Sequence, residues 1–142
     1  MEFTQQDANY NSVVSHNQSI VKLAHAELAT PCFISPNNNA ELSIQSLSEI
    51  DKEFLFKLTC QESLDLLIIG TGARAIFLSE KQRVSLSELG LGVECMNNTS
   101  ACSSFNLLLS DARSVGLLIL CLLTYSKSLS YSTDTSKLTP PF

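Results

Sequence analysis

The residues of this chain whose types and spacing could do chemistry lie around a glycine-rich turn. The stretch DLLIIGTGARAIFL, residues 65–78, carries Gly70, Gly72 and Ala75 after an apolar run, and Glu94 follows roughly 20 residues on. A GxGxx(G/A) pattern of this kind binds the pyrophosphate of a dinucleotide at a helix N-terminus, with an acid for the ribose. The same glycines could instead form a tight turn where a buried strand ends.

Two observations favour the tight turn over the dinucleotide loop. Residues 74–78 carry no helix cap, and the first cap signal is the pair Ser79 and Gln82, so no helix is predicted to begin at the glycines. Only residues 95–142 remain after Glu94, which is too little chain for the other units of a doubly wound dinucleotide domain. We therefore interpret the glycines as a bend made for packing.

Further candidate side chains gather where the carboxyl ends of two predicted strands meet the start of the following helix. Ligands collect at this edge in α/β sheets. If the chain has a ligand site, we expect it here, without a metal or a cofactor. The candidate residues, including two farther along the helix, are Gly70, Gly72, Glu94, Asn97, Asn98, Cys102, Asn106 and Arg113.

Each of these candidates also has a structural interpretation. Glu94 could be a catalytic carboxylate, but a bond to the backbone of the following turn is favoured. Cys102 lies in the first helical turn, where the helix dipole can stabilise a thiolate. No histidine is near in sequence to act as a base, so a structural cysteine is favoured. Asn106 is expected to bond a neighbouring loop, and Arg113 to pair with Glu94 or Asp111. No catalytic residue is assigned.

Composition narrows the class of protein. The 142 residues fit one domain. The net charge of -5 and the scattered Lys and Arg residues argue against a nucleic-acid partner. Five cysteines, odd in number and widely spaced, give neither a disulfide framework nor a zinc signature with His16 and His25. The first residues resemble neither a secretory signal nor a presequence, so a cytoplasmic location is expected.

The elements that must position the candidates follow from hydrophobic periodicity and cap residues. Residues 1–17 are predicted to be a flexible arm or a loosely attached edge, 18–124 one α/β domain, and 125–142 a disordered Ser/Thr-rich tail or an accidental extension. The first third is expected to be antiparallel, with His25 in an edge-like strand. The predicted strands are 20–23, 32–34, 42–44, 65–69, 91–96 and 115–123, and the predicted helices begin near Ser48, at Ser79, and at Thr99 or Ser100.

The apolar run at 115–123, VGLLILCLL, allows two interpretations. A membrane-spanning helix needs about 20 apolar residues, and this run is much shorter. A strand buried in the centre of a sheet is therefore favoured over a membrane anchor, and no membrane insertion is expected.

The segment from Asp65 through GLGVECMNNTSACSSFNLLLSDARSVGLLIL resembles a family of small domains of unknown function. This family includes the mitochondrial respiratory complex I assembly factor three and many bacterial proteins. The match covers roughly residues 65–120. The residues that carry it are Asp65, Gly70, Thr71, Gly72, Gly92, Glu94, Met96, Ala101, Asn106, Leu108 and Arg113.

The resemblance implies a single compact three-layer β/α domain with a mixed central sheet and a short antiparallel N-terminal part, in which GTG is a turn. The chain departs from the family pattern in two places. Asn97 and Asn98 stand where an Asp-Thr pair is usual, and residues 103–105 replace a common Arg-Thr-Tyr. These changes remove one acid and one base from the rim of a pocket, so an acid/base or anion-binding role is less expected there.

Two functions from different classes follow. The first is a non-catalytic protein-interaction or assembly-type factor with a protein partner, monomeric or weakly self-associating. The alternative is a small-molecule binder or enzyme with a pocket near Gly72, Glu94 and Cys102. For bacterial members of the family the resemblance implies no established reaction.

Overall fold

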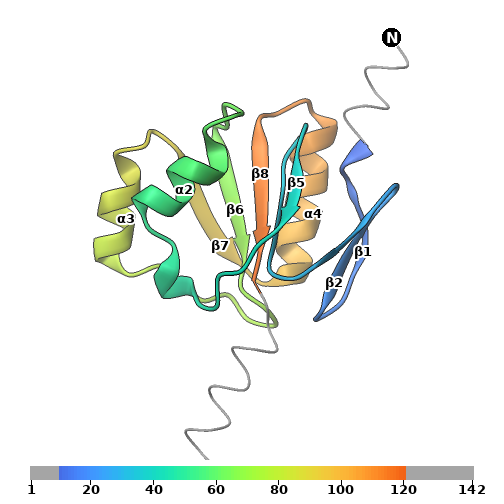
Figure 1. The fold of residues 1–142 in the computed structure, drawn as a ribbon, viewed down its shortest axis with the longest axis horizontal. Coiled ribbons are helices and arrows are strands. Elements are labelled where there is room, and N and C mark those ends of the chain that lie inside the picture. The colour runs from blue at the N-terminus through green and yellow to red at the C-terminus, as the bar shows by residue number, and fades with distance from the viewer. Residues whose placement is uncertain (1–9, 121–142) are drawn as a thin grey trace, which may run out of the picture.

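A computed structural model describes residues 10–120 of the chain (Figure 1). This part contains eight strands, three α-helices and one 3-10 helix, with strands and helices alternating from α2 onward. Their bounds are β1 Val13–His16, β2 Ile20–Leu23, β3 Glu27–Ala29, β4 Cys32–Ile34, β5 Asn39–Glu41, η1 Leu47–Glu49, α2 Lys52–Thr59, β6 Leu66–Gly70, α3 Glu80–Ser87, β7 Gly92–Met96, α4 Asn98–Ser110 and β8 Val115–Ile119.

The strands form two sheets. Strands β1, β2 and β3 make a small antiparallel sheet, in that order. The larger sheet has the order β5-β4-β8-β6-β7, with β6 parallel to both β7 and β8 and with β4 antiparallel to β8 and β5. The predicted mixed sheet with an antiparallel N-terminal part is therefore confirmed.

The central strands are buried because they carry apolar side chains on both faces. All five residues of β8 are buried, and so are four of the five in β6. Helices α2 and α3 cover one face of the sheet and α4 covers the other, which gives the three predicted layers (Figure 1). The small sheet packs beside α4, since Val21 and Leu23 share a core cluster with Phe105 and Leu109. No helix within residues 10–120 is long and apolar enough to cross a membrane.

Local cap chemistry sets the helix starts. At α3 the capping box of Ser79 and Gln82 is present as predicted, and Gly90 follows the helix with φ +69°. Helix α2 begins after Asp51, whose carboxylate accepts a bond from Phe54 N–H, and not near Ser48, which lies in η1. Helix α4 is capped by Asn97, not by the expected Thr99 or Ser100.

The N-terminal predictions need three corrections. Strand β1 begins at Val13, so part of the predicted arm 1–17 belongs to the small sheet, where Val13 is buried. The strand expected at 42–44 is wrong in position. The strand in this region is β5, residues 39–41, because these residues pair with β4 across a short turn. His25 lies between strands and stacks on Tyr10, with ring centroids 3.6 Å apart. The predicted tail 125–142 lies outside the described residues.

Candidate functional site

The GTG sequence forms a tight turn at the carboxyl end of β6. Gly72 has φ +104°, which favours glycine. The buried Thr71 fixes the turn through its hydroxyl, which donates to the carbonyl of Arg74 (2.7 Å) and accepts from the N–H of Ile76 (2.9 Å). No helix begins between Gly70 and Glu80, so the geometry that a dinucleotide loop requires is missing at this turn.

Asn98, the first residue of α4, holds this turn against the helix. Its Oδ1 accepts the N–H of Gly72 at 2.9 Å, and its own backbone N–H donates to the carbonyl of Gly72 at 2.7 Å. Asn98 as a whole is only 9% exposed. Gly70 is required because an added Cβ would lie 2.5 Å from that Oδ1. Asn97 completes the junction by accepting Ser100 N–H at 2.8 Å.

A cavity of about 200 Å³ opens beside this junction. Its walls come from three parts of the fold: the Gly72 turn, the start of α4, and the turn that joins β1 to β2. The lining residues are His16, Asn17, Gln18, Gly72, Ala73, Asn98 and Thr99. Of the pocket residues expected together, Gly72 lines this cavity, whereas Glu94 and Cys102 do not.

The residues of the β1–β2 turn are not among the predicted site residues. His16 and Asn17 fall within the predicted N-terminal arm, and Gln18 lies next to it, because this segment shows no sustained periodicity. The one available signal was the Asn-Gln-Ser turn composition at 17–19 between two apolar segments. Asn17 does act as a turn residue, since its Oδ1 accepts the N–H groups of Ser19 and Ile20.

The other candidate residues lie apart from the cavity. Glu94 is exposed on β7, and Asn97 makes the cap bond that was expected of Glu94. Asn106 bonds a strand, not a loop: its side chain accepts Val13 N–H at 2.8 Å and donates to Val13 carbonyl at 2.9 Å. Arg113 follows the opposite end of α4, and none of the ion pairs within residues 10–120 includes it.

Cys102 packs in the core cluster under α4 and is 4% exposed. Burial raises the pKa of its thiol from 9.0 to about 11. Burial likewise raises the pKa of Cys32 to about 12, with Cys102 as a smaller contribution. The helix dipole therefore does not produce a thiolate here. Within the part of the chain that the structure describes, no group of three His, Cys, Asp or Glu residues is placed to hold a metal.

Native Cys102 is expected to react with iodoacetamide about a hundredfold more slowly than an ordinary thiol at pH 8. The raised pKa, a difference of about two from 9.0, lowers the thiolate fraction by that factor. The protonated thiol stabilises the fold below pH 9, and this contribution is lost as the pH rises toward 11. Peptide mass spectrometry measures the rate, with the exposed Cys60 as internal control. Equal rates at the two cysteines would contradict the assignment.

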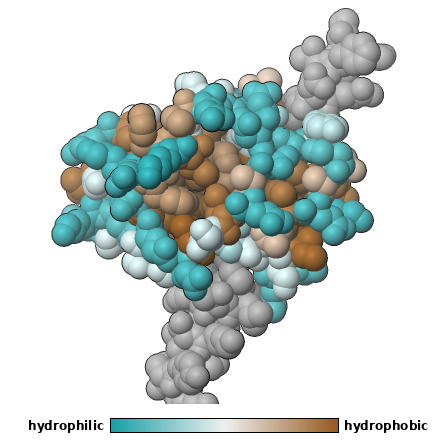
Figure 2. All heavy atoms as spheres, viewed as in Figure 1, coloured by the Kyte–Doolittle hydropathy of each residue, from teal (hydrophilic) through white to brown (hydrophobic). Residues whose placement is uncertain are grey.

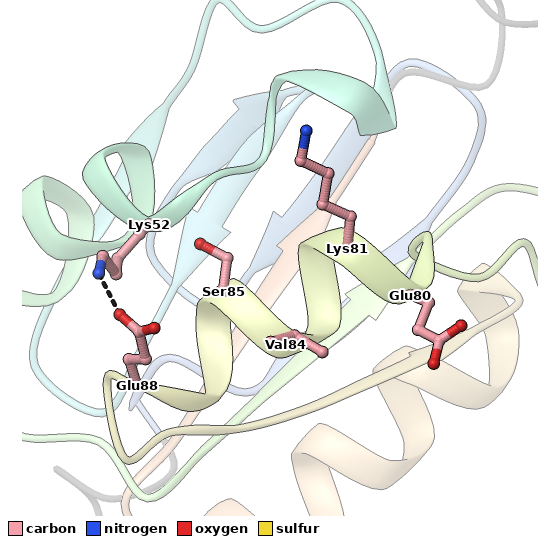
Figure 3. Close-up of a pocket in the computed structure, with 6 residues that line it drawn as sticks. All are labelled: Lys52, Glu80, Lys81, Val84, Ser85 and Glu88. Atoms are coloured by element: carbon pink, nitrogen blue, oxygen red, sulfur yellow. Dashed lines mark hydrogen bonds and ion pairs between the residues drawn. The ribbon is translucent and has the colours of Figure 1, made fainter.

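A second surface feature lies on the α3 side of the molecule. A shallow groove is lined by Lys52, Glu80, Lys81, Val84, Ser85 and Glu88 (Figure 3). Lys52 reaches from α2 to form an ion pair with Glu88 at the end of α3. The hydrogen bond from Lys52, together with its charge, lowers the pKa of the Glu88 carboxyl. Both charges are exposed, so the ion pair adds little to the stability of the fold. Its main effect is to hold the two side chains in place at the edge of the groove.

Solved structures define the class of fold. A protein of Bordetella parapertussis superimposes with a TM-score of 0.69 at 23% identity, covering 78% of this chain and 95% of that one. A protein of Xanthomonas campestris gives a TM-score of 0.69 at 22% identity, covering 86% and 93%. A Mth938-like domain of Bordetella pertussis gives 0.65 at 20% identity, covering 80% and 87%. The chain thus has the fold of the Mth938-like domains.

The family follows from the sequence itself. Residues 13–120 match the model of a family described as protein of unknown function (DUF498/DUF598), and the chain belongs to that family. The expected relationship to assembly factor three is confirmed as well. The assembly factor 3 of the NADH dehydrogenase [ubiquinone] 1 alpha subcomplex of Danio rerio is 32% identical over 84 residues, 58% of this chain and 48% of that protein.

Two further relatives show how much of the chain is shared. The same assembly factor of Bos taurus is 25% identical over 87 residues, 61% of this chain and 47% of that protein. An uncharacterised protein of Rhodobacter capsulatus is 40% identical over 57 residues, 40% of this chain and 46% of that protein. The chain therefore spans about half the length of the curated relatives that it matches.

Proposed function

We propose that this chain acts without catalysis as a protein-interaction or assembly-type factor, and that the layer of α2 and α3 is its docking face. The observation that carries this proposal is the exposure of three large apolar side chains in that layer. Phe56 on α2 is 60% exposed, Phe77 before α3 is 68% exposed, and Val84 on α3 is 61% exposed. Exposed aromatic residues with a polar surround are typical of protein interfaces.

The surroundings of these side chains fit the same role. Apolar surface shows between hydrophilic side chains over the α2 and α3 side of the molecule (Figure 2). The groove around Val84 carries both signs of charge, from Lys52, Lys81, Glu80 and Glu88 (Figure 3). Such a rim orients a partner more than it adds affinity. The curated relatives named as assembly factors support a partner that is itself a protein.

Site-specific photo-crosslinking tests the docking face. A photoreactive phenylalanine at position 77 is expected to capture one discrete protein partner in the native host extract. The same probe at Leu107, which is equally exposed at 68% but lies on α4 across the sheet, is the matched control. The double variant Phe56→Ser, Val84→Ser should then reduce capture at 77, because it removes apolar contact area without touching the core. Equal capture at 77 and 107 would overturn the assignment.

A cytoplasmic location and a monomeric or weakly self-associating chain belong to this proposal too. The scattered charges and the net charge of -5 support a chain that stays apart from its own copies. Light scattering over a range of protein concentrations tests this: a stable dimer at low concentration would contradict it.

A further inference from the structure

The cavity beside the GTG turn contains a buried donor without a partner. The Oδ1 atom of Asn98 is fixed by the N–H of Gly72, so the amide nitrogen Nδ2 is the end of the side chain left for the cavity. Among residues 10–120, Nδ2 has no hydrogen-bond partner, although the residue is only 9% exposed. A buried polar group in this state is costly unless something from outside satisfies it.

Two further residues of the lining carry backbone donors without a described partner. The N–H of Thr99 is one of the first-turn amides of α4, and it bonds neither the Asn97 cap nor any other described group. The N–H of Ala73, next to Gly72, also has no partner in the described part of the chain. Both residues belong to the lining, together with Asn98. Three lining residues, Ala73, Asn98 and Thr99, therefore each carry a donor that bonds no described group, and Ala73 and Thr99 are exposed.

Charge and size define what would satisfy these donors. The described lining contains no Asp, Glu, Lys or Arg, and the first turn of α4 has no acid. The positive end of a 13-residue helix therefore faces the cavity without competition. A helix N-terminus with amide donors can bind a phosphate or a carboxylate. The lining has no Arg or Lys to meet the second charge of a phosphate, so a singly charged carboxylate is the better match. About 200 Å³ holds only a handful of non-hydrogen atoms.

We propose that this cavity binds the carboxylate of a small organic acid, held by Asn98 Nδ2 and the N–H groups of Ala73 and Thr99. This activity goes beyond the protein-interaction function and uses a different part of the molecule. The ligand enters between the β1–β2 turn and the start of α4, so His16, Asn17 and Gln18 contact the part of the acid beyond its carboxylate.

An NMR titration of the full chain with acetate tests this proposal. Acetate is expected to produce saturable shifts of the Ala73 and Thr99 amides and of the Asn98 side-chain amide. Acetamide, which has the same shape without the charge, should produce much smaller shifts at equal concentration. Inorganic phosphate and sodium chloride are run in parallel. Phosphate binding tighter than acetate, equal effects of acetamide, or shifts that follow ionic strength alone would each overturn the assignment to a carboxylate.

A matched pair of variants locates the site. Thr99→Glu places a carboxylate at the exposed second position of α4, where an acid favours the helix, so the variant is expected to fold. It should weaken acetate binding at least about tenfold, because the new charge repels the ligand. Thr99→Gln adds similar bulk without charge and should keep binding within about threefold. Equal loss in both variants, or no loss in Thr99→Glu, would place the acetate elsewhere and overturn the proposal.

Discussion

Replacing Gly70 with alanine is expected to lower the free energy of unfolding by about 1 to 3 kcal/mol. The added Cβ would lie too close to three atoms, namely Oδ1 of Asn98 at 2.5 Å, Cδ1 of Ile119 at 2.6 Å and Cβ of Ala101 at 3.2 Å. Asn98 cannot turn aside without losing its bond to Gly72, and the Cβ of Ala101 moves only with the α4 backbone. Urea unfolding followed by circular dichroism measures the change.

Gly92→Ala is the control for this substitution. Gly92 lies on the neighbouring strand β7 and is exposed, and its added Cβ would come no closer than 3.3 Å to Leu66 Cδ1. Its effect should stay within about 0.5 kcal/mol. If Gly70→Ala unfolded at the same urea concentration as the unsubstituted chain, the close packing of the turn on α4 would be wrong.

Asn98→Ala is expected to lower the free energy of unfolding by about 2 to 3 kcal/mol. The substitution leaves the buried N–H of Gly72 without its acceptor, and an unsatisfied buried donor costs about 1 to 3 kcal/mol. The shortened side chain adds a small void next to Gly70. Urea unfolding gives the loss of stability, and hydrogen exchange at the Gly72 amide should accelerate by a matching factor.

Asn97→Ala separates this bond from ordinary helix capping. Asn97 is the N-cap of α4, and its side chain bonds only the N–H of Ser100 among residues 10–120, so loss of that side chain should cost about 1 kcal/mol. It should leave hydrogen exchange at Gly72 nearly unchanged relative to global stability. A larger effect of Asn97→Ala than of Asn98→Ala would mean that the turn is held mainly by the helix cap.

Local patterns in the sequence were enough to predict the part of the fold that has strong periodicity. The apolar runs of β6 and β8 and the Ser79 capping box of α3 were recognised because each signal lies within a few residues. The predicted start of α2 near Ser48 is wrong because Ser48 and Asp51 are both good cap residues. Only the backbone geometry of η1 decides between them.

The candidate site was predicted only in part, for a physical reason. Gly72, Asn97 and Asn98 were recognised because the topology of a parallel pair places them at one edge of the sheet. The approach of His16 to Asn98 joins segments about 80 residues apart, and no local pattern encodes such a contact. Nor does the sequence distinguish two adjacent asparagines, one capping from outside the helix and the other buried at its first position.

The strand order of the larger sheet has a consequence for how the chain folds during synthesis. Strand β8 comes last among the described strands, yet it lies between β4 and β6 in the sheet. It pairs with β4, so that Ile119 lies opposite Cys32, a residue far away in the sequence. Until residue 119 leaves the ribosome, the two halves of the sheet have no shared hydrogen bonds. We expect nascent chains that end before Val115 to remain protease-sensitive, and limited proteolysis of stalled chains checks this.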